Sequence, residues 1–251
     1  MRTIAFTNQK GGSCKTTSAV NLAAALGEKG QKVLLVDLDP QASASAWCGA
    51  SDGKGLLEVF TGNGSLSDLV SKTSIPGVSV IPSSSWLMGA ERALMGEVGA
   101  ETILRKAVSR LPKTWDFVLV DCPPALGLLA VSALVAVREV LVPVEASVMA
   151  LAGLASLLHT VERVKERLNP DLTISAILPC RVDTRTNLSK DVVERLREKF
   201  GDLVLKTVIR ENVRLREAPS FSEPITLYDT KSTGAEDYRS AAEELLERGQ
   251  K

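Results

Sequence analysis

The segment from Asn8 to Thr17 carries the residue types that a phosphate-binding loop requires. It contains two lysines, Lys10 and Lys15, with glycines after the first and threonines after the second. Backbone N–H groups at a helix N-terminus converge on an anion, and small residues let that backbone approach phosphates closely. Lys15 would then contact the β- and γ-phosphates, and the Thr16 hydroxyl would bind Mg²⁺. The residues predicted to bind nucleotide are Lys10, Gly11, Gly12, Ser13, Cys14, Lys15, Thr16 and Thr17, of which Thr17 would reach the α-phosphate.

This segment matches the GxxxxGK[ST] pattern imperfectly. Gln9 occupies the position of the first glycine, and Cys14 occupies that of the glycine before the lysine. The alternative is a glycine-rich turn between a strand and a helix, with no ligand. That alternative leaves two lysines directed at one turn unexplained, so the sequence favours a phosphate site.

Two aspartates follow apolar runs that are typical of buried strands. Asp39 comes after Val33–Asp37, and Asp121 ends the run that begins at Phe117. In open α/β folds ligands bind at the carboxyl edge of the sheet, where these carboxylates would lie. We expect Asp121 to hold the Mg²⁺ shell and Asp39 to orient the attacking water, with Thr16, Asp39 and Asp121 around the metal. Helix capping is the alternative role of an isolated Asp at a strand end.

The elements that must position these residues follow from a strand–helix alternation along the whole chain. The protein has 251 residues, of which 45% are apolar and 24% charged. These values are ordinary for a globular protein and exclude collagen-like, low-complexity and disordered classes. The alternation predicts an α/β fold with one doubly wound, mostly parallel sheet, helices on both faces, and a single domain over residues 1–251.

The expected elements can be assigned to residue ranges. A helix should run from the phosphate loop to about Lys29, and the serine- and glycine-rich stretch Ala42–Ser74 should form short helices and loops. The last helix should begin at Thr233, with the Thr233 hydroxyl as cap and Glu236 reaching back in a capping box. The candidate strands are Thr3–Thr7, Lys32–Asp37, Val78–Pro82, Phe117–Asp121, Glu139–Val144, Thr173–Pro179 and Leu203–Val208.

Charge and cysteine content limit the cellular setting. Thirty basic residues balance thirty acidic ones, so a nucleic-acid contact would need a local patch. The four cysteines are scattered, and no secretory signal precedes the first apolar run, which favours a reduced cytoplasmic protein. The most apolar stretch, Ala125–Val137, is shorter than the roughly 20 residues that span a bilayer.

The motifs together resemble the deviant Walker A ATPases of the ParA/MinD group, and most closely the Soj-type ParA partition ATPases. The resemblance covers essentially the whole chain. It implies a P-loop NTPase fold, ATP and Mg²⁺ as cofactors, and slow basal hydrolysis of ATP to ADP and phosphate. The segments that carry it are KGGSCKTT, VLLVDLDPQ, DCPPALGLL, DTRTNLS, ENVRLREAPS and STGAEDY.

The resemblance also implies roles for individual residues. Lys10 would reach across an ATP-sandwich homodimer to the nucleotide of the partner, so Lys10, Lys15 and Asp39 would be catalytic. The segment around Asn212 would lie near the adenine. Arg185 and Arg214 would bind double-stranded DNA without sequence preference.

The implied function is partition of chromosome or plasmid DNA by an ATPase associated with the nucleoid. A ParB-like centromere-binding partner would stimulate hydrolysis and so release the protein from DNA. Three alternatives remain: an ATPase that positions another cargo through a different adaptor, a membrane-associated ATPase of the MinD type, and a redox enzyme that uses Cys122 to hold an iron–sulfur cluster. A net acidic C-terminal segment from Glu236 argues against membrane binding.

Some residues depart from the family pattern. Cys14 replaces a common glycine, Arg210-Glu211 stands where Pro-Arg is frequent, and Lys231 and Thr233 replace two arginines. Between Arg181 and Arg216 there are ten basic and six acidic residues, a modest excess that a solvated helix face would also show. His159, the only histidine, is expected on a helix surface without a role.

Overall fold

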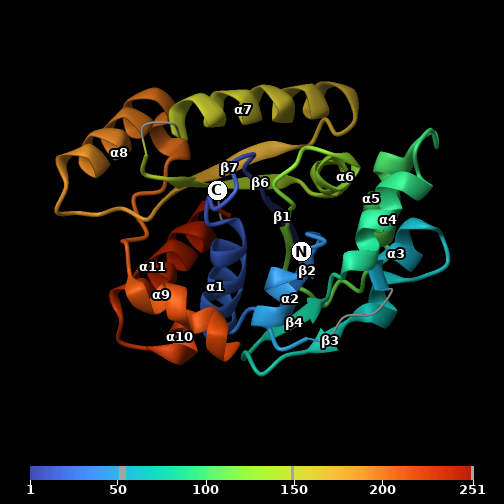
Figure 1. Cartoon of the computed structure of the whole chain (residues 1–251), viewed down its shortest axis with the longest axis horizontal. Coiled ribbons are helices and arrows are strands. Elements are labelled where there is room, and N and C mark those ends of the chain that lie inside the picture. The colour runs from blue at the N-terminus through green and yellow to red at the C-terminus, as the bar shows by residue number, and fades with distance from the viewer. Residues whose placement is uncertain (51–54, 148–149, 250–251) are drawn as a thin grey trace.

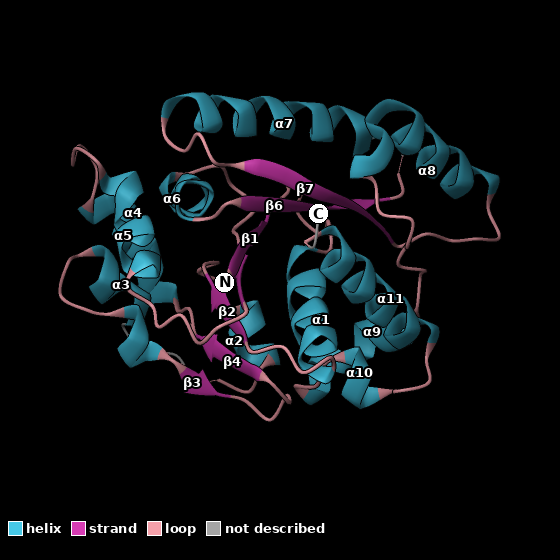
Figure 2. Ribbon diagram, turned by 180° about the vertical axis from the view of Figure 1, so that it is seen from behind, coloured by secondary structure: helices cyan, strands magenta, loops and turns pink. Residues whose placement is uncertain are grey.

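The computed structural model describes residues 1–50, 55–147 and 150–249. Its seven strands form one sheet in the order β3-β4-β2-β5-β1-β6-β7, in which β3 is antiparallel to β4 and the other neighbours are parallel (Figure 2). This confirms the predicted doubly wound, mostly parallel α/β architecture. The strands are β1 (Arg2–Phe6), β2 (Val33–Asp37), β3 (Ser71–Lys72), β4 (Val78–Ile81), β5 (Phe117–Asp121), β6 (Glu139–Glu145) and β7 (Thr173–Cys180).

Helices cover both faces of this sheet. Figure 1 shows α1 and α11 on one side of the central strands, with α5 and α6 on the other and α7 above β6 and β7. The helices are α1 (Lys15–Glu28), α2 (Ser43–Trp47), α3 (Gly55–Phe60), α4 (Met88–Ala93), α5 (Ile103–Ser109), α6 (Leu128–Ala136), α7 (Ala150–Arg167), α8 (Asn187–Phe200), α9 (Val213–Glu217), α10 (Ile225–Tyr228) and α11 (Thr233–Arg248).

Two apolar cores follow from the alternation of side chains along the central strands. In β2, Leu34 and Val36 pack into the core that contains α5, α6 and α7, whereas Val33 and Leu35 pack into the core under α1 and α11. Every residue of β2 is buried. A strand buried on both faces is continuously apolar, which is why this run was recognisable in the sequence.

The register brings the carboxyl ends of three central strands to one edge. Phe6 at the end of β1 and Asp37 at the end of β2 both stand opposite Asp121 at the end of β5. The loop that follows β1 therefore begins next to two buried carboxylates. The gathering of strand-end carboxylates at this edge was expected from the sequence, whereas the register that sets Asp37 opposite Asp121 was not.

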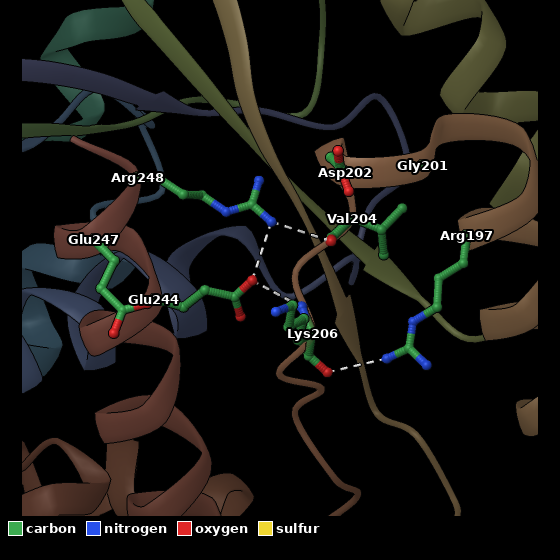
Figure 3. A pocket seen from close by; sticks show the side chains of 8 residues that line it. All are labelled: Arg197, Gly201, Asp202, Val204, Lys206, Glu244, Glu247 and Arg248. Atoms are coloured by element: carbon green, nitrogen blue, oxygen red, sulfur yellow. Dashed lines mark hydrogen bonds and ion pairs between the residues drawn. The ribbon is translucent and has the colours of Figure 1, made fainter. Parts of the chain in front are cut away.

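Six of the seven predicted strands are confirmed to within one residue at each end. The seventh, Leu203–Val208, is wrong. The chain makes a 3₁₀ turn at Gly201–Leu203, and Val204 forms only an isolated bridge with Ile177. The N–H groups of Lys206 and Thr207 then donate to the Glu244 carboxylate of α11, at 2.9 and 3.0 Å, instead of to a strand (Figure 3).

Two further differences concern short elements. β3, a strand of two residues, was not predicted, because so short a segment has no recognisable period. The N-cap of α11 is Ser232, whose hydroxyl accepts the N–H of Ala235, so the predicted Thr233 cap is wrong. The Thr233 hydroxyl accepts the Nδ2–H of Asn212 instead, and Glu236 pairs with Arg210.

Two further expectations about local structure agree with the described residues. Ala42–Ser74 contains α2, α3, a 3₁₀ turn and β3 joined by loops, although residues 51–54 lie outside the description. His159 is exposed on α7. Within the part of the chain that the structure describes, no helix has the length and apolar character needed to cross a bilayer.

Candidate functional site

The loop between β1 and α1 is open toward solvent on the side where a phosphate would bind. Gly12 has a φ of +71°, and Cys14, the N-cap of α1, has a φ of +66° and makes no side-chain cap. A Cβ on Gly11 or Gly12 would meet nothing within 4 Å. The first N–H groups of α1 thus have no side-chain acceptor from their cap, and such groups favour an anion.

The base of this loop is anchored to the neighbouring strand. The Asn8 amide donates to the carbonyl of Pro143 in β6 at 2.8 Å, and its oxygen accepts the N–H of Lys10 at 3.1 Å. Lys15 is buried behind the loop, with Nζ 3.4 Å from the Lys10 carbonyl. Burial lowers the pKa of Lys15, and the nearby Asp121 carboxylate opposes that effect.

Asp121 is the most unusual carboxylate of the site. It is fully buried, and neither of its oxygens has a hydrogen bond of ordinary geometry in the described structure. Burial and the adjacent Asp37 raise its pKa well above the ordinary value, while the nearby Thr16 hydroxyl opposes the shift. In its charged form such a buried carboxylate is strongly unfavourable, so it takes up a proton or binds a cation.

Asp37, which the sequence analysis did not select, lies beside Asp121 on the next strand. Its carboxylate accepts the N–H and the hydroxyl of Ser45 at 2.7 and 2.6 Å. Burial nevertheless raises its pKa to about 6. Because Asp37 already has hydrogen-bond partners, Asp121 is the carboxylate with free lone pairs.

Asp39 lies at the wall of an open cavity in front of the phosphate loop, whose size and lining are given below. Its N–H donates to Asp37 at 3.1 Å, and its Oδ1 accepts the N–H of Gln41 at 3.0 Å. Among the described residues no group of three or more Asp, Glu, His or Cys side chains could hold a metal alone. Mg²⁺ prefers few carboxylates plus waters and phosphate oxygens, so Thr16, Asp39 and Asp121 fit such a site.

The cavity in front of the loop has a volume of about 600 Å³. This size falls in the range of small-molecule sites, and the cavity unites most of the predicted nucleotide-binding residues. A hollow of about 730 Å³ lies elsewhere, between α8 and α11 (Figure 3). There Arg248 donates to Glu244 and to the Val204 carbonyl, and Arg197 donates to the Lys206 carbonyl. The cavity at the loop is lined by Gly11, Gly12, Ser13, Cys14, Lys15, Thr16, Thr17, Asp39, Ser43, Trp47, Pro124, Arg181, Arg216 and Pro219.

Lys10 points away from the loop interior. Its ammonium lies 2.6 Å from the Glu145 carboxylate at the end of β6 and 3.4 Å from the Ser147 hydroxyl. Glu145 also pairs with Arg181 at 2.9 Å. The Lys10 side chain is 45% exposed, so it is accessible to a group outside this subunit.

Asn212 lines a second, smaller cavity of about 80 Å³ that adjoins the loop. Its side-chain oxygen accepts the N–H of Arg214 and caps α9, while its nitrogen donates to Thr233. Cys14 and Thr17 also line this cavity, so it adjoins the phosphate loop. The expected place of the adenine near Asn212 stays a prediction.

Arg185 and Arg214 are both exposed, and each is paired with a carboxylate of its own segment. Arg185, in the loop after β7, contacts Asp183 at 2.9 Å and is 86% exposed. Arg214, in α9, contacts Glu217 at 2.8 Å and is 56% exposed. Three other arginines of the segment from Arg181 to Arg216 are paired as well, Arg181 with Glu145, Arg210 with Asp237 and Arg216 with Glu211.

Sequence reasoning missed Asp37, Glu145 and Arg181. Asp37 and Glu145 each end a strand, the same signal that identified Asp121. Arg181 directly follows β7 and could have been found by the same rule.

Cys122 does not fit a role in a cluster shared between subunits. Its side chain is buried, with Sγ 3.8 Å from the carbonyl of Val120, and burial raises its pKa. Cys14 differs, since the interaction with Cys180 lowers its pKa.

Comparison with known proteins adds independent information. A family model described as an AAA domain matches residues 1–174. The sporulation initiation inhibitor protein Soj of Bacillus subtilis is 43% identical over 249 residues, covering 98% of both chains. The chromosome-partitioning ATPase Soj of Thermus thermophilus is 44% identical over 250 residues, covering 100% of this chain and 97% of that protein.

A solved structure is also similar in its backbone. Cobyrinic acid a,c-diamide synthase from Mycobacterium smegmatis, with bound ATP analogue and magnesium, superimposes with a TM-score of 0.87 at 34% identity. The match covers 100% of this chain and 96% of that chain.

Proposed function

Since the chain belongs to the Soj/ParA family of ATPases, we propose that it binds Mg²⁺-ATP at the phosphate loop and couples hydrolysis to the partition of DNA. The observation that carries this proposal is the unpartnered, fully buried Asp121 directly behind an open phosphate loop. The proposed unit is the single ATPase domain of residues 1–251.

The nucleotide would bind along the 600 Å³ cavity. Residues 10–17 would surround the phosphates, with Lys15 on the β- and γ-phosphates, and the base would lie toward Asn212. Thr16, Asp39 and Asp121 would surround Mg²⁺, which when bound neutralises charge on the phosphate oxygens.

The hydrolytic step requires a group that orients water. Asp39 stands on the cavity wall, exposed enough to contact solvent, whereas Asp37 and Asp121 are buried. A carboxylate at this place would hold the attacking water and accept its proton. This assigns orientation of the nucleophile to Asp39 and cation binding to Asp121.

Dimerisation would follow from the position of Lys10. Its exposed ammonium is held by Glu145, outside its own phosphate loop, so it is available to a nucleotide in a facing subunit. ATP in both subunits would therefore join them into a homodimer in which Lys10 stabilises the γ-phosphate of the partner.

DNA would bind at Arg185 and Arg214. Both are exposed, and their present partners are surface carboxylates that a DNA phosphate could replace, because exposed ion pairs contribute little to stability. In a dimer this surface is doubled, which would confine DNA binding to the ATP state. Association with the nucleoid and release by a ParB-like partner complete the proposal.

Three other functions are less well supported. In α11 and the residue after it, acidic residues outnumber basic ones, which opposes binding to an anionic membrane of the kind expected for a MinD-type protein. The similarity to a diamide synthase, at 34% identity, is lower than the 40–44% shared with partition proteins. A ParA-like ATPase that positions another cargo would share this entire site, so the identity of the adaptor distinguishes it.

A direct test combines nucleotide and DNA. The Asp39→Ala protein should bind mixed-sequence duplex DNA in ATP and Mg²⁺, lose it in ADP, and not sediment with anionic vesicles. DNA binding in the absence of nucleotide would contradict the proposed coupling.

A further inference from the structure

Two cysteines that are far apart in the sequence meet beside the phosphate loop. Cys14 is the N-cap of α1, and Cys180 is the last residue of β7. Both line the same 80 Å³ cavity, and their thiol groups interact.

Ser18 of α1 contacts both cysteines. It lies one helical turn after Cys14, and its N–H donates to the Cys14 carbonyl at 2.8 Å. Its hydroxyl lies 3.7 Å from the Cys180 sulfur. The Cys14 backbone and the Cys180 side chain thus both contact Ser18, and the two cysteines line the same cavity beside it.

The backbone is unusual at Cys14 and at the residue that follows Cys180. Cys14 has a φ of +66°, and Arg181, directly after Cys180, has a φ of +52°. A residue with a Cβ in this region is strained relative to glycine. The Cys14 side chain makes no cap, and within the loop its sulfur lies 4.0 Å from the Gly12 carbonyl. The hydrogen bonds of the loop therefore do not explain a cysteine at this position.

The two thiols differ in access to solvent. All four cysteines lie in the described part of the chain, and Cys14 is the one that is not buried. It also lines the open 600 Å³ cavity, whereas Cys180 is 1% exposed. A small oxidant can reach Cys14 first, and Cys180 is then the adjacent thiol.

We propose that Cys14 and Cys180 form a redox-active pair that a peroxide closes into an intramolecular disulfide. The Cys14 sulfur attacks one oxygen of hydrogen peroxide, so that an S–O bond forms, the O–O bond breaks, and the displaced hydroxide leaves with the thiol proton as water. The Cys180 sulfur then attacks the sulfenic sulfur and forms the S–S bond. The expelled hydroxide takes the Cys180 proton as a second water, so two thiols are oxidised and one peroxide is reduced.

The consequence for the ATPase rests on the function proposed above. Cys14, Thr17, Arg181 and Arg216 line both cavities, so they form the passage between the phosphate side and the base side. A disulfide would tie the end of the phosphate loop to β7 across this passage. Oxidised protein should therefore bind nucleotide weakly, and a dithiol reductant should restore binding.

The test measures the disulfide itself before any activity. The full-length protein is treated with stoichiometric hydrogen peroxide, its free thiols are counted under denaturing conditions, and its peptides are identified by mass spectrometry without reduction. We expect the number of free thiols to fall from four to two, with a Cys14–Cys180 peptide that dithiothreitol removes. In the Cys14→Ser and Cys14→Gly proteins, the three remaining cysteines should form no intramolecular disulfide and should still be counted as free thiols.

A second measurement tests the disulfide proposal separately from the proposed ATPase function. ATP binding to oxidised and reduced protein is compared by calorimetry, with Cys14→Gly as the control that peroxide should not affect. Formation of the disulfide with unchanged ATP binding would contradict the proposed regulation only. Sulfinic acid at Cys14, or disulfides between molecules without a Cys14–Cys180 peptide, would overturn the pair. Absence of ATP binding in the reduced wild type would instead contradict the proposed function.

Discussion

The Lys10 ammonium lies 2.6 Å from the Glu145 carboxylate, at the edge of the sheet where the nucleotide would bind. Glu145 also contacts Arg181, so one carboxylate at the end of β6 holds cations from two loops. In the proposed dimer, Lys10 would have to leave this partner before it could contact a nucleotide in a second subunit. The ion pair would then favour a conformation of Lys10 in the free subunit that differs from the one in the dimer.

This relationship predicts opposite effects for two substitutions. Lys10→Ala should keep ATP binding, because Lys15 remains, but should abolish the ATP-dependent dimer. Glu145→Gln releases Lys10 and should form the dimer at a lower ATP concentration. Light scattering in an Asp39→Ala background measures both. If Glu145→Gln prevented dimerisation as Lys10→Ala does, Glu145 would have to support Lys10 in the dimer.

Lys15→Ala should weaken ATP binding by about 30-fold or more, because a hydrogen bond from a charged group contributes about 2 kcal/mol. The buried Lys15 donates from Nζ to the Lys10 carbonyl at 3.4 Å, and it forms no ion pair with a carboxylate of the described residues, so its charge remains available to phosphates. Calorimetric titration with Mg²⁺-ATP measures the change. Lys29→Ala, a substitution at the far end of α1, is the control and should bind ATP normally.

Asp39→Ala should bind ATP and dimerise but hydrolyse ATP about 100-fold more slowly, since it loses the group that orients water. Release of phosphate in a single turnover measures this step. Asp68→Ala, on an exposed 3₁₀ turn, serves as a matched control. If the Asp39→Ala protein hydrolysed ATP at the wild-type rate, a group other than Asp39 would have to orient the attacking water.

DNA binding should depend steeply on salt and on two arginines. Each phosphate contact adds about −0.9 to the slope of log affinity against log salt concentration, so Arg185→Ala and Arg214→Ala should each reduce the slope by about 1 per subunit. A shift assay with mixed-sequence duplex DNA at several salt concentrations measures it. Arg163→Ala, on α7, is the control. Binding that neither substitution changes would place the DNA surface elsewhere.

Glu244 should stabilise the fold in a pH-dependent manner. Its pKa is lowered in the folded protein, because the N–H groups of Thr207 and Lys206 and the Arg248 side chain together outweigh the cost of burial. A lowered pKa means that the stabilisation is present above the ordinary value of 4.5 and is lost as the pH falls through the folded value. Glu244→Ala should lower stability at pH 7 by about 1–2 kcal/mol, or roughly 2–8 °C in Tm. Thermal unfolding at neutral and acidic pH should show the difference shrinking in acid, and an unchanged difference would contradict this role.

Local sequence patterns determined most of the architecture and the phosphate loop. Runs such as Val33–Asp37 are apolar at every position because both faces of the sheet are covered, and that signal needs no tertiary knowledge. The loop was recognisable because glycines, lysines and threonines must be adjacent in sequence to surround phosphates. Strand-end carboxylates followed from the same logic, and Asp121 was selected on that basis.

Tertiary structure decided which groups meet. Leu203–Val208 has the composition of a strand. The N–H groups of Lys206 and Thr207, however, donate to the carboxylate of Glu244, which is distant in sequence, and not to a neighbouring strand. Asp37 faces Asp121 only because β2 and β5 are neighbours in register. Lys10 and Glu145, and Cys14 and Cys180, are brought together by the order of β1, β6 and β7 in the sheet. Such pairs depend on strand order and register, which a local sequence pattern does not encode. The reason is that strands can hydrogen-bond to each other whatever their separation along the chain.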